Sequence, residues 1–177
     1  AGRRPRAPNG GGGGRALATL HEGARGRVAI YGLESPEGVP VDVHAKVCII
    51  DDQWTSVGSD NFNRRSWTHD SELTAAVCDP GYARELRLSL AREHLDREGP
   101  LEDLHDPAHM FAAFADCATR LQRWHDDGCR GARPPGRLRP VSDGALTGFT
   151  RAWAAMPYRL IYDPDGRPIK NRIRRSF

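Results

Sequence analysis

Alternating apolar and polar residues predict four β-strands in the first half of the chain. The clearest alternation runs over residues 41–50, where valine, alanine and isoleucine at the odd positions oppose mostly polar residues at the even ones. His44 and Lys46 both occupy even positions, so we expect their side chains to leave the same face of one strand. The other predicted strands are residues 27–31, 54–57 and 71–78.

A helix is predicted to follow the fourth strand. Asp79 precedes a proline, which is typical of an N-cap followed by the first helical residue. Tyr82, Leu86 and Leu90 then recur every four residues, the spacing of one helical face. The pattern stops at Gly99 and the proline after it, where we expect the helix to have ended.

A second helix is predicted after Asp106, which again precedes a proline. An apolar stripe then runs from Met110 through Phe114, Cys117 and Leu121 to Trp124 and stops before a glycine, a length of about six turns. We expect this stripe to pack in the protein core rather than to bind lipid.

These elements indicate an α/β fold in which a mixed β-sheet is flanked by α-helices, with an irregular C-terminal tail. Residues 1–16 are rich in Gly, Arg and Pro, so we expect a flexible linker there. Residues 17–128 would form the folded domain, and residues 129–177 an Arg/Pro/Gly-rich extension. The glycine-rich opening and the missing initial Met favour a fragment of a longer protein.

The composition fits one soluble domain. Of the 177 residues, 38% are hydrophobic and 28% are charged, with a formal net charge of +3. No apolar run approaches the roughly 20 residues that cross a bilayer. The four cysteines lack C-x-x-C spacing, which disfavours a zinc or redox pair, and we expect Cys48 and Cys78 to be buried in apolar strands. We expect five histidines to lie on the surface, on helices or in loops: His69, His94, His105, His109 and His125.

One group of polar residues carries a fixed spacing: His44-x-Lys46, four residues, Asp51, six residues, Gly58-Ser59-x-Asn61. An anionic phosphodiester needs fixed cations and hydrogen-bond donors around its non-bridging oxygens. Lys46 supplies a charge and the Asn61 amide supplies donors, presented by a turn that we expect Gly58 to make possible. Histidine exchanges a proton near neutral pH, so His44 can act as nucleophile or proton shuttle.

This spacing resembles the signature of the phospholipase D superfamily, and the resemblance extends over about residues 39–79, including Glu72 and residues 63–66. At lower specificity, the whole sequence is similar to the C-terminal part of bacterial phospholipase D-like and cardiolipin synthase-like proteins. In that family two such motifs meet across a pseudo-twofold axis. One histidine attacks phosphorus to form a phosphohistidine, and the other protonates the leaving alcohol.

The resemblance implies a role for each residue. His44 would be the general acid if an upstream half carried the nucleophile, and would serve both roles in a homodimer. Glu72 would hold a catalytic imidazole by its ring N–H, while Asp51 and Ser59 would support the site. Arg64 and Arg65 would contact phosphate or form salt bridges with Asp60 or Asp70. No metal or cofactor is required, and no cluster of ligand residues indicates one.

Three functions are compatible with these residues. The first is hydrolysis of a phospholipid or transfer of its phosphatidyl group at a membrane surface. The second is a phosphodiesterase acting on nucleic acid, which is disfavoured because no patch of basic and aromatic residues on one element marks a platform for stacking bases. The third is a catalytically silent half-site whose partner motif lies upstream. The unpaired cysteines favour a cytoplasmic or peripheral membrane location, and the sequence leaves this open.

Overall fold

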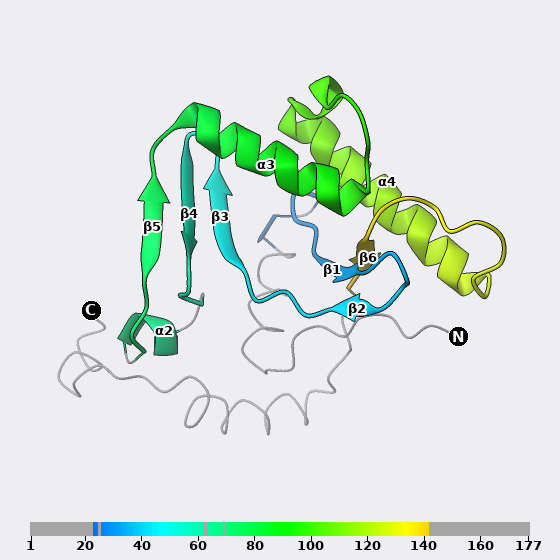
Figure 1. Ribbon diagram of the computed structural model, residues 1–177, viewed down its shortest axis with the longest axis horizontal. Coiled ribbons are helices and arrows are strands. Elements are labelled where there is room, and N and C mark those ends of the chain that lie inside the picture. The colour runs from blue at the N-terminus through cyan, green and yellow to red at the C-terminus, as the bar shows by residue number, and fades with distance from the viewer. Residues whose placement is uncertain (1–22, 25, 62–63, 69, 142–177) are drawn as a thin grey trace.

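Two three-stranded antiparallel sheets and their helices make up the part of the chain that the computed structural model describes, residues 23–24, 26–61, 64–68 and 70–141 (Figure 1). The first sheet has the order β2-β1-β6, with β1 (Tyr31–Glu34), β2 (Pro40–Val41) and β6 (Leu138–Pro140). The second has the order β3-β4-β5, with β3 (Lys46–Ile50), β4 (Trp54–Gly58) and β5 (Thr74–Val77). The helices are α2 (Arg64–Thr68), α3 (Pro80–Leu95), the 3-10 helix η1 (Glu102–Leu104) and α4 (Pro107–Asp126).

The expected α/β class, with strands flanked by helices, is confirmed. The predicted linker at residues 1–16 and residues 142–177 of the predicted tail lie outside the described residues. The described start of the predicted extension contributes β6, which pairs with β1.

The β3-β4 hairpin sets the register of the second sheet. Asp51 and Asp52, in the turn between these strands, both have left-handed backbone angles, with φ of 53° and 51°. β5 pairs antiparallel with the other edge of β4. The pairing places Lys46, Gly58 and Thr74 in one row across the three strands, at the end of the sheet away from the turn.

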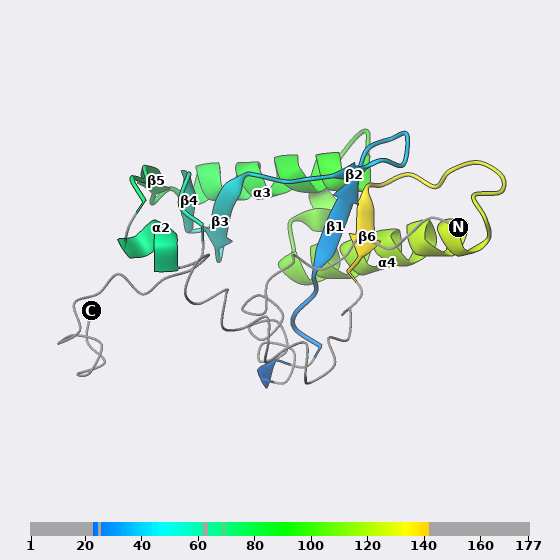
Figure 2. The ribbon, with the colours of Figure 1, turned by 90° about the horizontal axis from the view of Figure 1, so that it is seen from below.

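α3 bridges the two sheets (Figures 1 and 2). The carboxylate of Asp79 accepts a hydrogen bond from Tyr82 N at 3.0 Å, which confirms the predicted N-cap. The buried residues of α3 are Ala83, Arg87 and Ala91, one position after the tyrosine and leucine stripe, and Tyr82 itself is 44% exposed. Two alanines let the helix approach its neighbours closely, with Arg87 between them.

Arg87 is a buried cation that joins three segments of the chain. Its Nε and Nη2 donate to the two carboxylate oxygens of Asp52 at 2.6 and 2.7 Å. Its Nη1 and Nη2 also donate to the backbone carbonyls of Leu104 and His105, at 2.8 and 3.0 Å. The β3-β4 turn is thereby fixed to α3 and to the segment that leads into α4.

α4 packs against the first sheet and supplies most of the core there. Cys117 and Leu121 are fully buried, which confirms that the apolar stripe faces the core. Leu138 of β6 packs against Cys117. Asp106 accepts a hydrogen bond from Ala108 N at 2.8 Å, so the predicted N-cap is also confirmed.

The strand predicted over residues 41–50 is wrong as a continuous element. Val41 pairs with Leu33 in the first sheet, whereas Lys46 is the first residue of β3 in the second. Residues 42–45 carry the chain from one sheet to the other and have no strand structure. Alternation along the sequence could not reveal this crossing, because both flanking segments are extended.

The other strand predictions differ less. Trp54–Gly58 matches the prediction of residues 54–57. The prediction of residues 27–31 is wrong except at its end, because β1 is Tyr31–Glu34, where β2 and β6 supply partners. The strand predicted at 71–78 is shortened to Thr74–Val77.

Predictions of burial are wrong for three residues. Cys48 and Cys78 are exposed rather than buried. Cys48 pairs with Ser56. Thr55, the neighbour of Ser56 in β4, is fully buried, and successive side chains of a strand point to opposite faces. The side chains of Ser56 and Cys48 therefore lie on the face of the sheet opposite Thr55. His125, expected on the surface, is only 9% exposed, because it faces a carboxylate from the first sheet.

Candidate active site

The motif residues, with one exception, gather at one end of the second sheet. Lys46 begins β3, Gly58 ends β4, and these two residues pair directly. His44 lies two residues before β3, Ser59 follows β4, and Glu72 lies two residues before β5. Antiparallel pairing therefore brings the ends of three strands, and the polar residues beside them, to the same edge.

His44 and Lys46 are neighbours at this edge, but they do not share a strand. His44 is exposed and lies in the connection between the sheets. Lys46 is half-buried, and its Nζ donates to the backbone carbonyl of His44 at 2.7 Å. Within the described part of the chain, the His44 ring has no hydrogen bond. The prediction that a single strand aims both side chains is wrong, and a lysine-to-backbone contact links the two residues instead.

Glu72 fixes the loop that follows β4. Its Oε2 accepts from the Ser59 hydroxyl at 2.6 Å, and the Ser59 oxygen accepts from Leu73 N at 3.1 Å. Hydrogen bonds from Ser59 and then Ser66, together with the charges of Lys46 and Arg65, hold the pKa of Glu72 below its ordinary value. The carboxylate is therefore ionised near neutral pH. Among the hydrogen bonds of the described residues Glu72 has no imidazole partner, so its contact with a catalytic imidazole stays a prediction.

Ser66 is a site residue that the analysis of the sequence missed. It is 6% exposed, and its Oγ accepts from Asn61 N at 3.0 Å. Asn61 itself is exposed. Since the Ser66 hydroxyl also acts on Glu72, this one side chain connects the Asn61 backbone with the carboxylate. What could have pointed to Ser66 in the sequence is its place in residues 63–66, which share the resemblance to the phospholipase D superfamily.

Arg64 and Arg65 are the first two residues of α2. Arg65 forms an exposed salt bridge with Asp70, at 3.0 Å between Nε and Oδ1, one of the two alternatives expected from the sequence. Nearby, the Thr74 hydroxyl donates to a carboxylate oxygen of Asp60, which ties the loop after β4 to the start of β5.

Asp51 is the exception within the motif. It lies in the β3-β4 turn, exposed and with φ of 53°, at the end of β3 opposite Lys46. A five-residue strand rises about 3.3 Å per residue, so roughly 15 Å separates the two ends. Asp51 can act on the site only through the hairpin and not by direct contact.

Gly58 is required by a close approach between strands rather than by a turn. It pairs with Thr74 across the sheet, and a Cβ added to Gly58 would lie 2.6 Å from the Thr74 Cα. Its φ is not in the left-handed region. The expectation that Gly58 provides a turn is wrong, because its role is to let β5 approach β4.

Substituting Gly58→Ala should lower the free energy of unfolding by about 1–3 kcal/mol, because a backbone atom must shift to make room. Equilibrium urea denaturation measures the change. Gly23→Ala is a matched control, since a Cβ there meets nothing within 4 Å. Equal unfolding midpoints for the two variants would contradict the steric explanation.

The described residues contain no group of three or more His, Cys, Asp or Glu side chains that could hold a metal ion. Over the same residues, none of the helices has the length and apolar character needed to span a membrane. The reactive groups at this edge are the His44 imidazole, the Lys46 ammonium and the Asn61 amide. Two carboxylates, of Glu72 and Asp60, accept hydrogen bonds from hydroxyl groups there.

Comparisons with known proteins point to one family. The family model described as cardiolipin synthase, PLD-like domain, matches residues 11–93. Cardiolipin synthase 1 of Staphylococcus aureus strain MRSA252 is 42% identical over 79 residues, which cover 45% of this chain and 16% of that protein. Cardiolipin synthase 1 of strain COL is 42% identical over 52 residues, covering 29% and 10% respectively. The chain thus spans a small part of these relatives, and no solved structure matches it.

Proposed function

Since this chain belongs to the phospholipase D superfamily, we propose that it supplies one half of an active site that cleaves a phospholipid phosphodiester and transfers the phosphatidyl group to water or to an alcohol. The observation that carries the proposal is the gathering of His44, Lys46, Ser59, Asn61 and Glu72 at one open edge of the β3-β4-β5 sheet.

Lys46 and Asn61 would bind the non-bridging phosphate oxygens. An ammonium group has three N–H donors, and the His44 carbonyl uses one of them. Among the described residues the other two donors have no hydrogen-bond partner, so they can meet phosphate oxygens, and the bond to the backbone fixes where the ammonium sits. The Asn61 amide is exposed at the same edge, on a loop held by Ser66. Both groups stabilise the charge that develops as the phosphoryl group transfers.

His44 would move the proton. In the first step an imidazole nitrogen of a second motif attacks phosphorus, a P–N bond forms, and the P–O bond to the leaving alcohol breaks as His44 donates a proton to that oxygen. In the second step His44 takes a proton from water or an acceptor alcohol, whose oxygen attacks phosphorus while the P–N bond breaks. The exposed position of His44 leaves its ring open to both reactants.

Glu72 would position the site. One of its oxygens accepts from Ser59, and a carboxylate accepts up to about four hydrogen bonds. It can therefore keep the loop after β4 in place and still accept an imidazole N–H from either motif. The second motif would come from an upstream half of a longer protein, or from a second copy of this chain, in which case His44 of one copy is the nucleophile.

A phospholipid is favoured over nucleic acid because the relatives are named as cardiolipin synthases. Such a chain would work at the membrane surface, where the substrate headgroups lie. The nuclease alternative rests on the general ability of the same residues to act on any phosphodiester. Whether water or an alcohol accepts the phosphatidyl group would depend on the surface that the partner half contributes to the site.

The test is to incubate the purified chain with phosphatidylglycerol vesicles, and separately with single-stranded DNA, while size-exclusion chromatography records its oligomeric state. Release of glycerol or formation of a diphosphatidyl product by a dimer supports lipid chemistry. Cleavage of DNA without lipid turnover overturns the substrate assignment. An inert monomer identifies a half-site, and the same assays are then made with the longer protein.

A further inference from the structure

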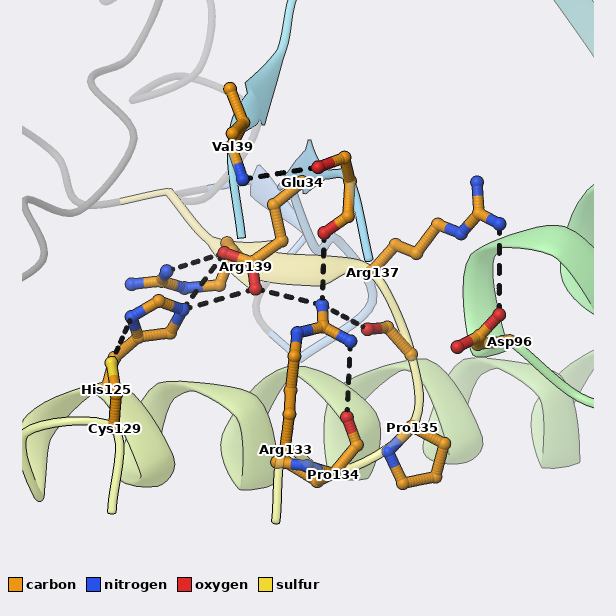
Figure 3. A network of polar contacts seen from close by, with 12 residues as sticks. Glu34, Val39, Asp96, His125, Cys129, Arg133, Pro134, Pro135, Arg137 and Arg139 are labelled. Atoms are coloured by element: carbon orange, nitrogen blue, oxygen red, sulfur yellow. Dashed lines mark hydrogen bonds and ion pairs between the residues drawn. The ribbon is translucent and has the colours of Figure 1, made fainter. Parts of the chain in front are cut away.

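A buried ion cluster joins the first sheet to α4, whereas the motif residues lie at the edge of the second sheet (Figure 3). Glu34, at the end of β1, is 2% exposed. Its carboxylate accepts from Arg139 Nη1 at 2.8 Å, from Arg133 Nη2 at 3.0 Å and from His125 Nε2 at 3.0 Å. Burial raises the pKa of Glu34, but these hydrogen bonds outweigh burial and hold the pKa below its ordinary value.

The cluster fixes the tautomer of His125. Because the Glu34 carboxylate only accepts hydrogen bonds when ionised, the proton of a neutral His125 ring lies on Nε2. The other ring nitrogen, Nδ1, then carries a lone pair. The Trp124 ring packs edge-on against the imidazole, with centroids 4.9 Å apart, and helps to hold its orientation.

Cys129 occupies the position that this lone pair faces. Its Sγ lies 3.6 Å from His125 Nδ1 (Figure 3). The residue follows the end of α4 with φ of 60°, and its backbone N–H donates to the Trp124 carbonyl at 2.9 Å. The thiol is therefore held by a helix-terminating turn, and the residue is exposed to solvent. A nucleophile, a base and a carboxylate that orients the base are thus arranged in series.

The other cysteines lack this arrangement. Cys48 and Cys78 are exposed, and the structure gives neither of them a histidine partner within the described residues. Cys117 is fully buried, and burial raises the pKa of its thiol.

We propose that Cys129, His125 and Glu34 form a thiol-exchange site that reacts with small disulfides. The site is separate from the edge that carries His44 and does not depend on the proposed function. Two guanidinium groups, of Arg133 and Arg139, face the single carboxylate of Glu34. The fixed charge of the cluster is therefore positive, which suits a disulfide that bears carboxylates.

The reaction is a balanced exchange. His125 Nδ1 takes the thiol proton while the Cys129 sulfur attacks one sulfur of the disulfide. A new S–S bond forms, the old one breaks, and the leaving thiolate receives the proton from the imidazolium. Glu34 offsets the transient charge on the ring. The products are a mixed disulfide at Cys129 and one small thiol, and no oxidant beyond the disulfide is needed.

The experiment treats the reduced full chain with glutathione disulfide and follows the modification of each cysteine by peptide mass spectrometry. Cys129 should react roughly tenfold faster than Cys48 and Cys78. His125→Gln keeps a donor for Glu34 and removes the ring base, so it should bring Cys129 down to the rate of the other exposed thiols. His109→Gln, at an exposed position of α4, is the matched control and should change no rate.

Cys117 reports folding in the same experiment, since it reacts only if the core opens. Equal rates for Cys129, Cys48 and Cys78 in the wild-type chain would overturn the proposal without recourse to any variant. Fast reaction of Cys129 that persists in His125→Gln, with Cys117 protected, would also overturn it, because the imidazole would then have no part in the reaction.

Discussion

Replacing His44 with alanine should reduce phosphodiester turnover by about a thousandfold or more, because it removes the imidazole that we propose as the proton donor and acceptor. The fold should be unaffected. His44 is exposed, lies outside the strands, and its ring makes no hydrogen bond among the residues described. Only its backbone carbonyl is used, by Lys46, and alanine keeps that carbonyl.

The measurement is the initial rate of phosphatidyl transfer or hydrolysis by the active assembly, with far-ultraviolet circular dichroism to confirm folding. His109→Ala removes an exposed histidine of α4 and should retain full activity. Turnover within a few fold of wild type in His44→Ala would remove this residue from the mechanism. Loss of activity in both histidine variants would indicate a general defect instead.

Replacing Asp52 with alanine should lower the free energy of unfolding by about 3–5 kcal/mol, because it leaves the Arg87 guanidinium buried without its counter-charge. Asp52 and Arg87 are each only 8% exposed, and two hydrogen bonds of 2.6 and 2.7 Å join them. The loss would be felt at the β3-β4 turn, at α3 and at the start of α4 together. Urea denaturation at neutral pH measures the effect.

Asp103→Ala is the matched control, since it removes an acidic partner of similar geometry from a far more exposed pair. Arg97 and Asp103 are 2.7 Å apart, with side chains 35% and 57% exposed, so the change should lower the stability far less than Asp52→Ala does. Similar losses in Asp52→Ala and Asp103→Ala would show that burial of the Arg87 pair is unimportant. The double variant Asp52→Leu, Arg87→Met should recover most of the stability, because no buried charge is left at the β3-β4 turn.

The same pair predicts sensitivity to acid. Hydrogen bonding to Arg87 holds the pKa of Asp52 below its ordinary value of 3.8. A carboxyl group with a lowered folded-state pKa contributes stability above its unfolded pKa and loses that contribution as the pH falls through the folded value. The unfolding free energy of the wild-type chain should therefore fall below about pH 4, and the double variant should lack this part of the loss.

Several features of the fold could be predicted because their causes are local. The N-caps at Asp79 and Asp106 form bonds to backbone groups only two or three residues away. The apolar stripe of α4 depends on helical spacing alone. The hairpin partner Trp54–Gly58 follows from its own composition and the turn before it.

Other features could not be predicted because they join residues far apart in the sequence. The Asp52–Arg87 contact spans 35 residues, and the His125–Glu34 contact spans 91. Periodicity classes arginine and histidine as surface residues, and only a partner from another element makes their burial favourable. The exposure of Cys48 likewise depends on which face of the sheet a helix covers.

The sequence by itself determined the resemblance to the phospholipase D superfamily, through the spacing of His44, Lys46, Asp51, Gly58, Ser59 and Asn61, because a motif is defined by residue type and spacing alone. Only the tertiary structure decided which of them meet. Strand pairing brings Lys46 to Gly58 and sends Asp51 to the opposite end of the sheet. The tertiary structure also showed that Gly58 lets β5 approach β4 closely at Thr74. The physical reason is that spacing along the chain records identity, whereas proximity depends on register, which long-range hydrogen bonds set.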